Sequence, residues 1–148
     1  MEYNSLRKIK YYSDCEPLVS GLGYLLVDLK VAPLKGSVHI TCVIAPKDST
    51  KSIGVDDCSK VHHALLPRLE ALLGTDNTYM EVTSPGMERN IKNAAEFELF
   101  VGREVRVWDK TKNDWVGGIV SSATDKSVTL GDVIVNYDDI AKAKFIHN

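Results

Sequence analysis

The fold is organised around one stretch, Thr78-Tyr79-Met80-Glu81-Val82-Thr83-Ser84-Pro85-Gly86-Met87-Glu88-Arg89-Asn90. Apolar and polar residues alternate over its first half, which is the period of a half-buried strand. Pro85 presets φ for a turn, and Gly86 supplies the positive φ that a type II turn needs at its third position. The stretch therefore predicts a strand that runs into a rigid turn and delivers Glu88 and Arg89 just past the edge of a sheet.

Upstream of this strand, the hydrophobic pattern alternates between helical and extended periods. After a lead-in at residues 1–10, predicted to be frayed, we expect a helix from residue 11 to Gly21, strands over 24–31 and 37–45, and a second helix from near Gly54 to Gly74. Pro17 and Pro67 fall inside the two helices and predict bends. The predicted N-terminal domain spans residues 1–90 and is a two-layer αββαβ arrangement within an α+β chain.

Downstream of residue 90, the pattern changes to short strands separated by turn residues. Asn93 is placed to cap a short helix that ends near Phe100. Five strands are then expected over residues 104–108, 115–123, 127–130, 133–136 and 142–146. Five short strands in so short a segment indicate a small closed barrel, so residues 91–148 form the predicted C-terminal domain.

Composition excludes several classes of protein. The 148 residues are 44% hydrophobic and 26% charged, which suits one modest core or two small ones. The formal net charge of -2 gives no global positive field, so any RNA contact must come from local patches. The three cysteines lack a C-x-x-C spacing, which is typical of a reducing compartment. No signal peptide or membrane span is visible in the sequence, and a cytoplasmic protein is expected.

Neither hydrolysis nor metal binding is supported by a complete motif. Ser84 lies on a turn, but Pro85 removes the backbone N–H that an oxyanion hole would use. Cys58 and His62 have helical i, i+4 spacing without the further ligands of a zinc site, and a half-buried histidine and a core cysteine are favoured. No catalytic, metal-binding or cofactor-binding residue is predicted, nor a small-molecule substrate.

Several residues of the predicted barrel are candidates for contact with RNA or protein. Lys110, Lys112 and Lys126 lie at predicted turns, where they are either solvated or part of a contact surface. Arg103 and Arg106 join them as candidate contact residues. The aromatic residues Trp108, Trp115 and Tyr137 could stack on bases, although filling the core or rim of the barrel is the favoured interpretation.

The turn after the central strand gives a second set of candidates. Ser84, Pro85, Gly86, Glu88 and Arg89 are predicted to contact a partner or to couple the two halves of the chain. A guanidinium group binds phosphate or carboxylate groups well, and it can equally form an internal ion pair. The internal clamp is the favoured interpretation of Arg89, and partner binding stays open.

Several blocks of the sequence resemble one family, the bacterial ribosome maturation factor RimP. They occur in the family's order and cover nearly the whole chain: Leu22-Gly23-Tyr24-Leu25-Leu26-Val27-Asp28, Asp57-Cys58, Glu81-Val82-Thr83-Ser84-Pro85-Gly86-Met87-Glu88-Arg89, Phe97-Glu98-Leu99-Phe100-Val101-Gly102-Arg103-Glu104-Val105, and Asp139-Ile140-Ala141-Lys142-Ala143. The block around Ser84-Pro85-Gly86 is the most specific of them.

The resemblance implies an N-terminal α/β domain and a C-terminal SH3-like (Sm-like) barrel. It also implies a non-enzymatic, monomeric assembly factor that binds the free small (30S) ribosomal subunit, through its 16S rRNA and ribosomal protein S-twelve. Two other classes of function remain open. A standalone Sm-like module would bind naked RNA through residues 91–148, and a hydrolase would need Ser84 or the pair Cys58 and His62.

Overall fold

The computed structural model describes residues 1–48, 51–84 and 88–146, with the backbone alone for Glu88 and Arg89. Its contacts divide the chain into two units. The α/β unit is Leu6–Ser84, and the β unit is Met1–Ser5 together with Pro85–Asn148. The β unit is thus assembled from both ends of the chain.

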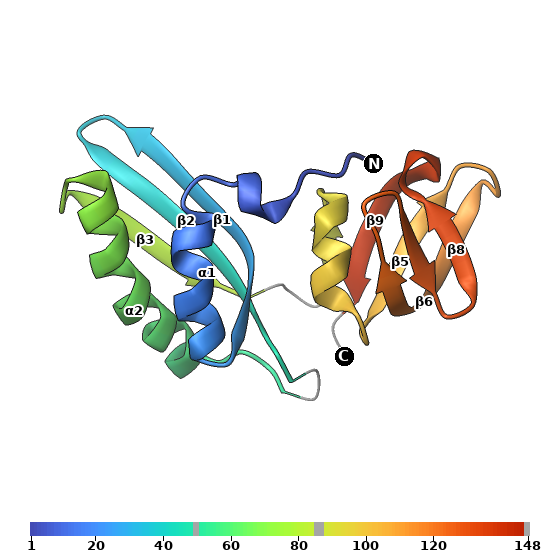
Figure 1. Cartoon of the computed structure of the whole chain (residues 1–148), viewed down its shortest axis with the longest axis horizontal. Helices are drawn as coiled ribbons and strands as arrows, with labels where there is room; N and C mark the ends of the chain where they lie inside the picture. Colours follow the sequence, from blue (N-terminus) through green and yellow to red (C-terminus); the bar gives the residue numbers. More distant parts are fainter. Residues whose placement is uncertain (49–50, 85–87, 147–148) are drawn as a thin grey trace. The chain divides into compact units, whose positions relative to one another are not determined.

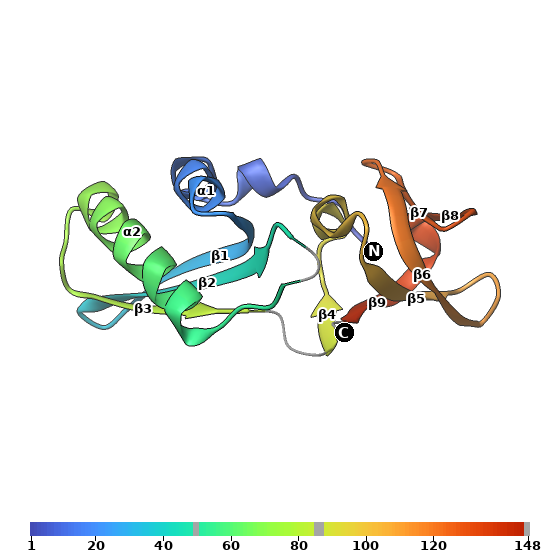
Figure 2. The same cartoon turned by 90° about the horizontal axis from the view of Figure 1, so that it is seen from below.

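In the α/β unit, two helices lie on one face of a three-stranded sheet (Figures 1 and 2). Its elements in chain order are η1 (Leu6–Lys8), α1 (Tyr12–Gly21), β1 (Tyr24–Leu34), β2 (Ser37–Pro46), α2 (Val55–Leu73) and β3 (Thr78–Thr83). Strands β1 and β2 form an antiparallel hairpin, whereas β2 and β3 are parallel. The parallel pair requires a long crossover, which α2 supplies. The predicted αββαβ order is confirmed.

The core of the α/β unit lies between the helices and the sheet. Val61, Leu65 and Leu69 follow one another at i, i+4 spacing on α2 and are fully buried. They pack with Ile40 and Ile44 of β2. Ile40 alternates with exposed positions as in a half-buried strand, whereas both neighbours of Ile44 are buried too. The hydrophobic period read from the sequence thus corresponds to the buried faces.

A hydrogen-bonded group fixes the start of α2 against β1. Asp57, in the first turn of the helix, accepts a hydrogen bond from the backbone N–H of Gly54 at 2.7 Å through Oδ2. Its Oδ1 accepts another from the hydroxyl of Tyr24. These hydrogen bonds, chiefly the one from Tyr24, lower the pKa of Asp57, and the same contact raises the pKa of Tyr24 to about 12.

The β unit contains a six-stranded antiparallel sheet in the order β4-β9-β5-β6-β7-β8. Its elements are β4 (Glu88–Ile91), η2 (Ala94–Phe100), β5 (Glu104–Asp109), β6 (Asp114–Ala123), β7 (Ser127–Leu130), β8 (Val133–Asn136), η3 (Tyr137–Asp139) and β9 (Ile140–Ile146). The five predicted strands are confirmed, and β4 is an additional one. Among the strand pairings of the described residues, none joins β8 to β4, so the expected barrel closure is not seen.

The first residues of the chain are held against the β unit by hydrogen bonds. The carbonyl oxygen of Glu2 accepts from the backbone N–H of Ala94 at 2.9 Å. Asn4 donates its backbone N–H to Oδ1 of Asn93 at 2.9 Å and accepts from Nδ2 of the same side chain at 2.7 Å. Tyr3 stacks on Tyr137 with ring centroids 6.1 Å apart. The prediction of a frayed lead-in is therefore wrong for these residues.

Candidate nucleic-acid and partner interface

The residues of the central turn are only partly covered by the structure. Ser84 follows β3 and is exposed. Pro85 and Gly86 lie outside the described residues, so the type II turn stays a prediction. The backbones of Glu88 and Arg89 belong to β4, where they pair with Ile146 and Phe145 of β9. Both interpretations of Arg89 concern its side chain, which lies outside the described atoms, and both stay predictions.

The three loop lysines do not form one cluster. Lys110 and Lys112 lie in the turn before β6, and Lys126 lies in the turn after it; all three are exposed. The two turns are at opposite ends of β6, which spans about 30 Å at 3.3 Å per residue.

Asp109 shapes the turn before β6, because its Oδ1 accepts a hydrogen bond from the backbone N–H of Thr111 at 2.9 Å and another from the hydroxyl of Thr111 at 2.6 Å.

A different set of side chains does come together, on the outer face of the β unit. On β5, Val105 and Val107 are fully buried, so Arg106 and Trp108 point to the opposite, outer side. Strand pairing places Trp108 opposite Trp115 of β6 and opposite Lys142 of β9.

The same pairing places Arg106 opposite Gly117 of β6 and Lys144 of β9. We call the five side chains Arg106, Trp108, Trp115, Lys142 and Lys144 the basic–aromatic face.

The two indole rings of this face contact each other and both lysines. Their centroids are 5.6 Å apart with an interplanar angle of 86°, an edge-to-face pair. The Nζ of Lys142 lies 5.8 Å from the centroid of Trp108 and 5.6 Å from that of Trp115. Lys144 Nζ lies 5.7 Å from the Trp115 centroid. These are cation–π distances, so the rings and the charges form a single cluster.

Gly117 makes room for the arginine of this face. A Cβ at Gly117 would lie 3.4 Å from Cγ of Arg106, so the aliphatic part of Arg106 lies directly over this glycine. The other predicted arginine, Arg103, precedes β5, is half-buried and is not among the outward positions of the strand. Of the basic candidate contact residues named from the sequence, Arg106 is the one that strand pairing places on the basic–aromatic face.

Lys142 and Lys144 were missed by the sequence prediction. Their signal is the alternation of Lys142 and Lys144 with the buried residues Ala143 and Phe145, which places both cations on the outer side of a strand. The alternation alone does not predict which side chains of other strands lie next to Lys142 and Lys144. Those depend on β9 pairing with β5, whose partner residues are distant in the sequence.

Tyr137 has a structural role. It is 3% exposed, its hydroxyl donates to the carbonyl oxygen of Thr124 at 2.6 Å, and its ring also stacks on Phe97 with centroids 5.8 Å apart. Burial raises the pKa of Tyr137. These contacts confirm the prediction that it fills the core, and they remove it as a base-stacking candidate.

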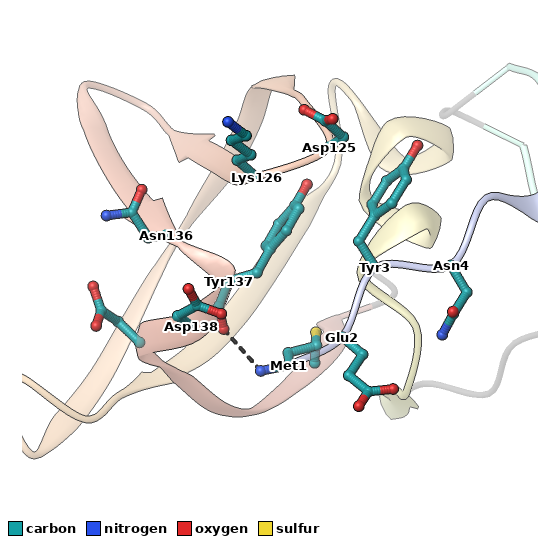
Figure 3. A pocket seen from close by; sticks show the side chains of 10 residues that line it. Met1, Glu2, Tyr3, Asn4, Asp125, Lys126, Asn136, Tyr137 and Asp138 are labelled. Carbon is teal, nitrogen blue, oxygen red and sulfur yellow. Dashed lines mark hydrogen bonds between the residues drawn. The ribbon is translucent and has the colours of Figure 1, made fainter.

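Tyr137 also lines a pocket of about 750 Å³ between the first residues and the β7–β9 region, within the β unit (Figure 3). Figure 3 shows Asp125, Lys126 and Asn136 at its other side. The pocket is open and carries charges of both signs, and nothing in it selects a particular ligand.

The residues considered for catalysis or metal binding are not assembled into a site. His62 is half-buried, as predicted, while Cys58 is half-buried rather than in the core. Within residues 1–48, 51–84 and 88–146, no group of three or more histidine, cysteine or acidic side chains is placed to hold a metal ion. None of the helices in the described part of the chain is long and apolar enough to cross a membrane.

Comparison with known proteins identifies relatives of the chain. The family model described as the RimP N-terminal domain matches residues 14–88, which corresponds closely to the α/β unit. The chain is also similar to the ribosome maturation factor RimP of Albidiferax ferrireducens, with 36% identity over 117 residues. That alignment covers 75% of this chain and 56% of the relative, so the chain spans little more than half the length of the relative that it matches.

Proposed function

Because the chain belongs to the RimP family, we propose that it is a ribosome maturation factor that acts in assembly of the small (30S) ribosomal subunit. The observation that carries this proposal is the family match over residues 14–88, together with a relative that bears the name of such a factor. In this proposal the protein binds immature subunits and does not catalyse a reaction.

Binding alone can promote assembly if it favours one conformation of the immature subunit. A binding protein shifts such an equilibrium only by its difference in affinity for the two conformations. We therefore propose that the chain binds a folding intermediate of 16S rRNA and ribosomal protein S-twelve more tightly than it binds the mature subunit. Its loss of affinity for the mature form would then release it.

We further propose that the β unit has an SH3-like (Sm-like) architecture. The support is the order of its elements: a short helix, four strands in sequence, a single helical turn at η3, and a last strand that pairs beside the first of the five. Short loops and exposed strand faces of such a module are suited to docking on RNA or protein.

The turn residues Ser84, Pro85, Gly86, Glu88 and Arg89 and the basic residues Arg103, Arg106, Lys110, Lys112 and Lys126 remain proposed contact residues. For the chain as a whole we propose that different parts of the surface contact protein and RNA. The net charge of -2 favours protein contacts over most of the surface, while local clusters of cations bind RNA.

Sedimentation of a cell lysate tests the proposed function. The tagged protein should migrate with free small subunits and be absent from paired ribosomes. Migration only at the top of the gradient, even at low salt, would contradict the proposal. A second candidate, a standalone Sm-like RNA-binding module, predicts that residues 91–148 alone bind naked RNA tightly and with a strong dependence on salt.

A further inference from the structure

The outer face of the β unit combines flat aromatic rings with positive charges. Arg106, Lys142 and Lys144 supply three cations on the neighbouring strands β5 and β9. Trp108 of β5 lies between its two pairing partners, Trp115 of β6 and Lys142 of β9. Glu104 is the one acidic residue at the outward positions of β5, β6 and β9 in the described chain. The face is therefore positive, although the whole chain carries a net charge of -2.

We propose that the basic–aromatic face binds an unpaired stretch of RNA, with bases stacked on the indoles of Trp108 and Trp115 and phosphates bound by Lys142, Lys144 and Arg106. Single-stranded nucleic acid is commonly bound by a positive surface that follows the backbone and by aromatic side chains that stack on bases. The inference deepens the proposed function by naming the kind of RNA recognised, and it can be tested on the isolated protein.

Geometry favours this occupant over an acidic peptide. An acidic segment would pair with the cations but would offer no aromatic or apolar group to the two indole rings. An apolar segment would cover the indoles and would remove three cations from water, which is costly. An RNA strand presents flat bases and regularly spaced phosphates together, so it matches both components of the face.

The rings are held in position before any ligand arrives. Each indole is half-buried, the two rings contact each other edge to face, and Lys142 lies within 6 Å of both centroids. Side chains held in this way lose little further freedom on binding, so stacking on them is favoured. The ammonium groups lie over the rings, so a base that stacks on an indole displaces them, and their flexible side chains keep them within reach of the phosphate attached to that base.

The sequence provides a built-in reporter for this face. The chain has two tryptophans, and both belong to it. Bases that stack on the indoles should quench the intrinsic fluorescence of the full chain. The probe is an oligouridylate of about ten nucleotides, a length in the range that small binding modules occupy.

We expect saturable quenching with a strong dependence on salt. Three phosphate contacts on a single strand predict a slope of about -2 for log K against log salt concentration. The double variant Lys142→Ala/Lys144→Ala should reduce the slope to about -0.7, because one cation is left. Its matched control, Lys30→Ala/Lys35→Ala, removes the same charge from exposed positions of the α/β unit and should bind like the unaltered chain.

The stacking component is tested separately by Trp115→Leu, which keeps an apolar side chain and leaves Trp108 as the reporter. Affinity should fall about tenfold while the salt slope stays unchanged. A thermal melt of each variant verifies that it is folded under the conditions of the titration.

Four outcomes would overturn the proposal. The first is that oligouridylate does not quench the tryptophan fluorescence, and the second is that both lysine double variants lose affinity equally. The third is that an RNA duplex binds as tightly as the single strand, and the fourth is that oligoglutamate quenches the fluorescence but oligouridylate does not. Failure here is distinguishable from failure of the proposed function, because co-sedimentation with small subunits is measured independently of the isolated face.

Discussion

Asn4 and Asn93 form a reciprocal pair although they are 89 residues apart in the sequence. The side chain of Asn93 accepts from the backbone N–H of Asn4 and donates to its carbonyl oxygen. The same Oδ1 also accepts from the backbone N–H of Ala95 at 3.1 Å, which caps η2. One side chain thus joins the first residues of the chain to the start of this helix.

Replacing Asn93 by alanine should loosen both elements. Loss of the cap and of the pair with Asn4 is expected to lower the free energy of unfolding by about 1–2 kcal/mol. Urea unfolding measures the total effect, and hydrogen exchange should show faster exchange at the amides of Asn4 and Ala95. Asn93→Asp is the matched control, since it keeps the accepting oxygen and loses only the donor to Asn4. If exchange at the Asn4 amide were unchanged in Asn93→Ala, the pairing would be refuted.

The contact between Tyr24 and Asp57 should make stability depend on pH at both extremes. The pKa of Asp57 is lowered from its ordinary value of 3.8, so its contribution is complete above that pH and is lost as the pH falls through the lower value. The pKa of Tyr24 is raised from 10.0 to about 12, so its contribution is complete below pH 10 and is lost as the pH rises towards 12.

Tyr24→Phe removes this contact and measures it. The melting temperature of the variant should be lower than that of the unaltered chain between about pH 5 and pH 9, and the difference should shrink outside that range. Tyr79→Phe serves as the control, because Tyr79 is 60% exposed. A difference that stayed constant across the whole range would show that the hydroxyl of Tyr24 does not interact with Asp57.

The three cysteines should differ in their reactivity. Cys15 and Cys42 are fully buried, and burial raises their pKa values to about 11 and about 12. Cys58 is half-buried, and burial raises its pKa as well. At pH 8 a thiol-directed reagent should therefore label Cys58 first, and Cys15 and Cys42 only as the chain unfolds. The rapid phase should disappear in Cys58→Ser; its persistence there would contradict the assignment.

Arg89→Ala distinguishes the two hypotheses for that residue. If Arg89 forms an internal ion pair, the variant should melt at a lower temperature and with a less cooperative transition. If it binds a partner, the variant should melt normally and sediment less with small subunits. Lys92→Ala is the control, since it removes the same charge from an exposed position nearby. An unchanged melt together with unchanged sedimentation would reject both hypotheses.

The elements that sequence reasoning found are those with a local signal. Alternation predicted β1, β2 and β3, the stripe of Val61, Leu65 and Leu69 predicted α2, and Asn93 was recognised as a cap. The five strands β5 to β9 were also placed to within a few residues of their observed ends, because turn residues separate them. Each of these signals is carried by residues that are close together in the chain.

The features that were missed depend on contacts between distant residues. Nothing in residues 1–5 indicates that they dock beside Asn93 and Tyr137, because their hydrogen bonds are made largely through the backbone. Strand β4 was missed since its four residues have no clear alternation. The basic–aromatic face needed the register of β9 on β5, which no local pattern fixes. For that reason Arg106 was named from the sequence and its neighbours Lys142 and Lys144 were not.

The docking of Met1–Ser5 on the unit formed by the other end of the chain has a practical consequence for dissecting this protein. Cleavage between Ser84 and Pro85 does not yield two self-sufficient pieces, because the C-terminal piece lacks the peptide that covers Tyr137 and bonds to Asn93. A fragment designed for RNA-binding or structural work should carry these five residues through a fused linker or as an added peptide.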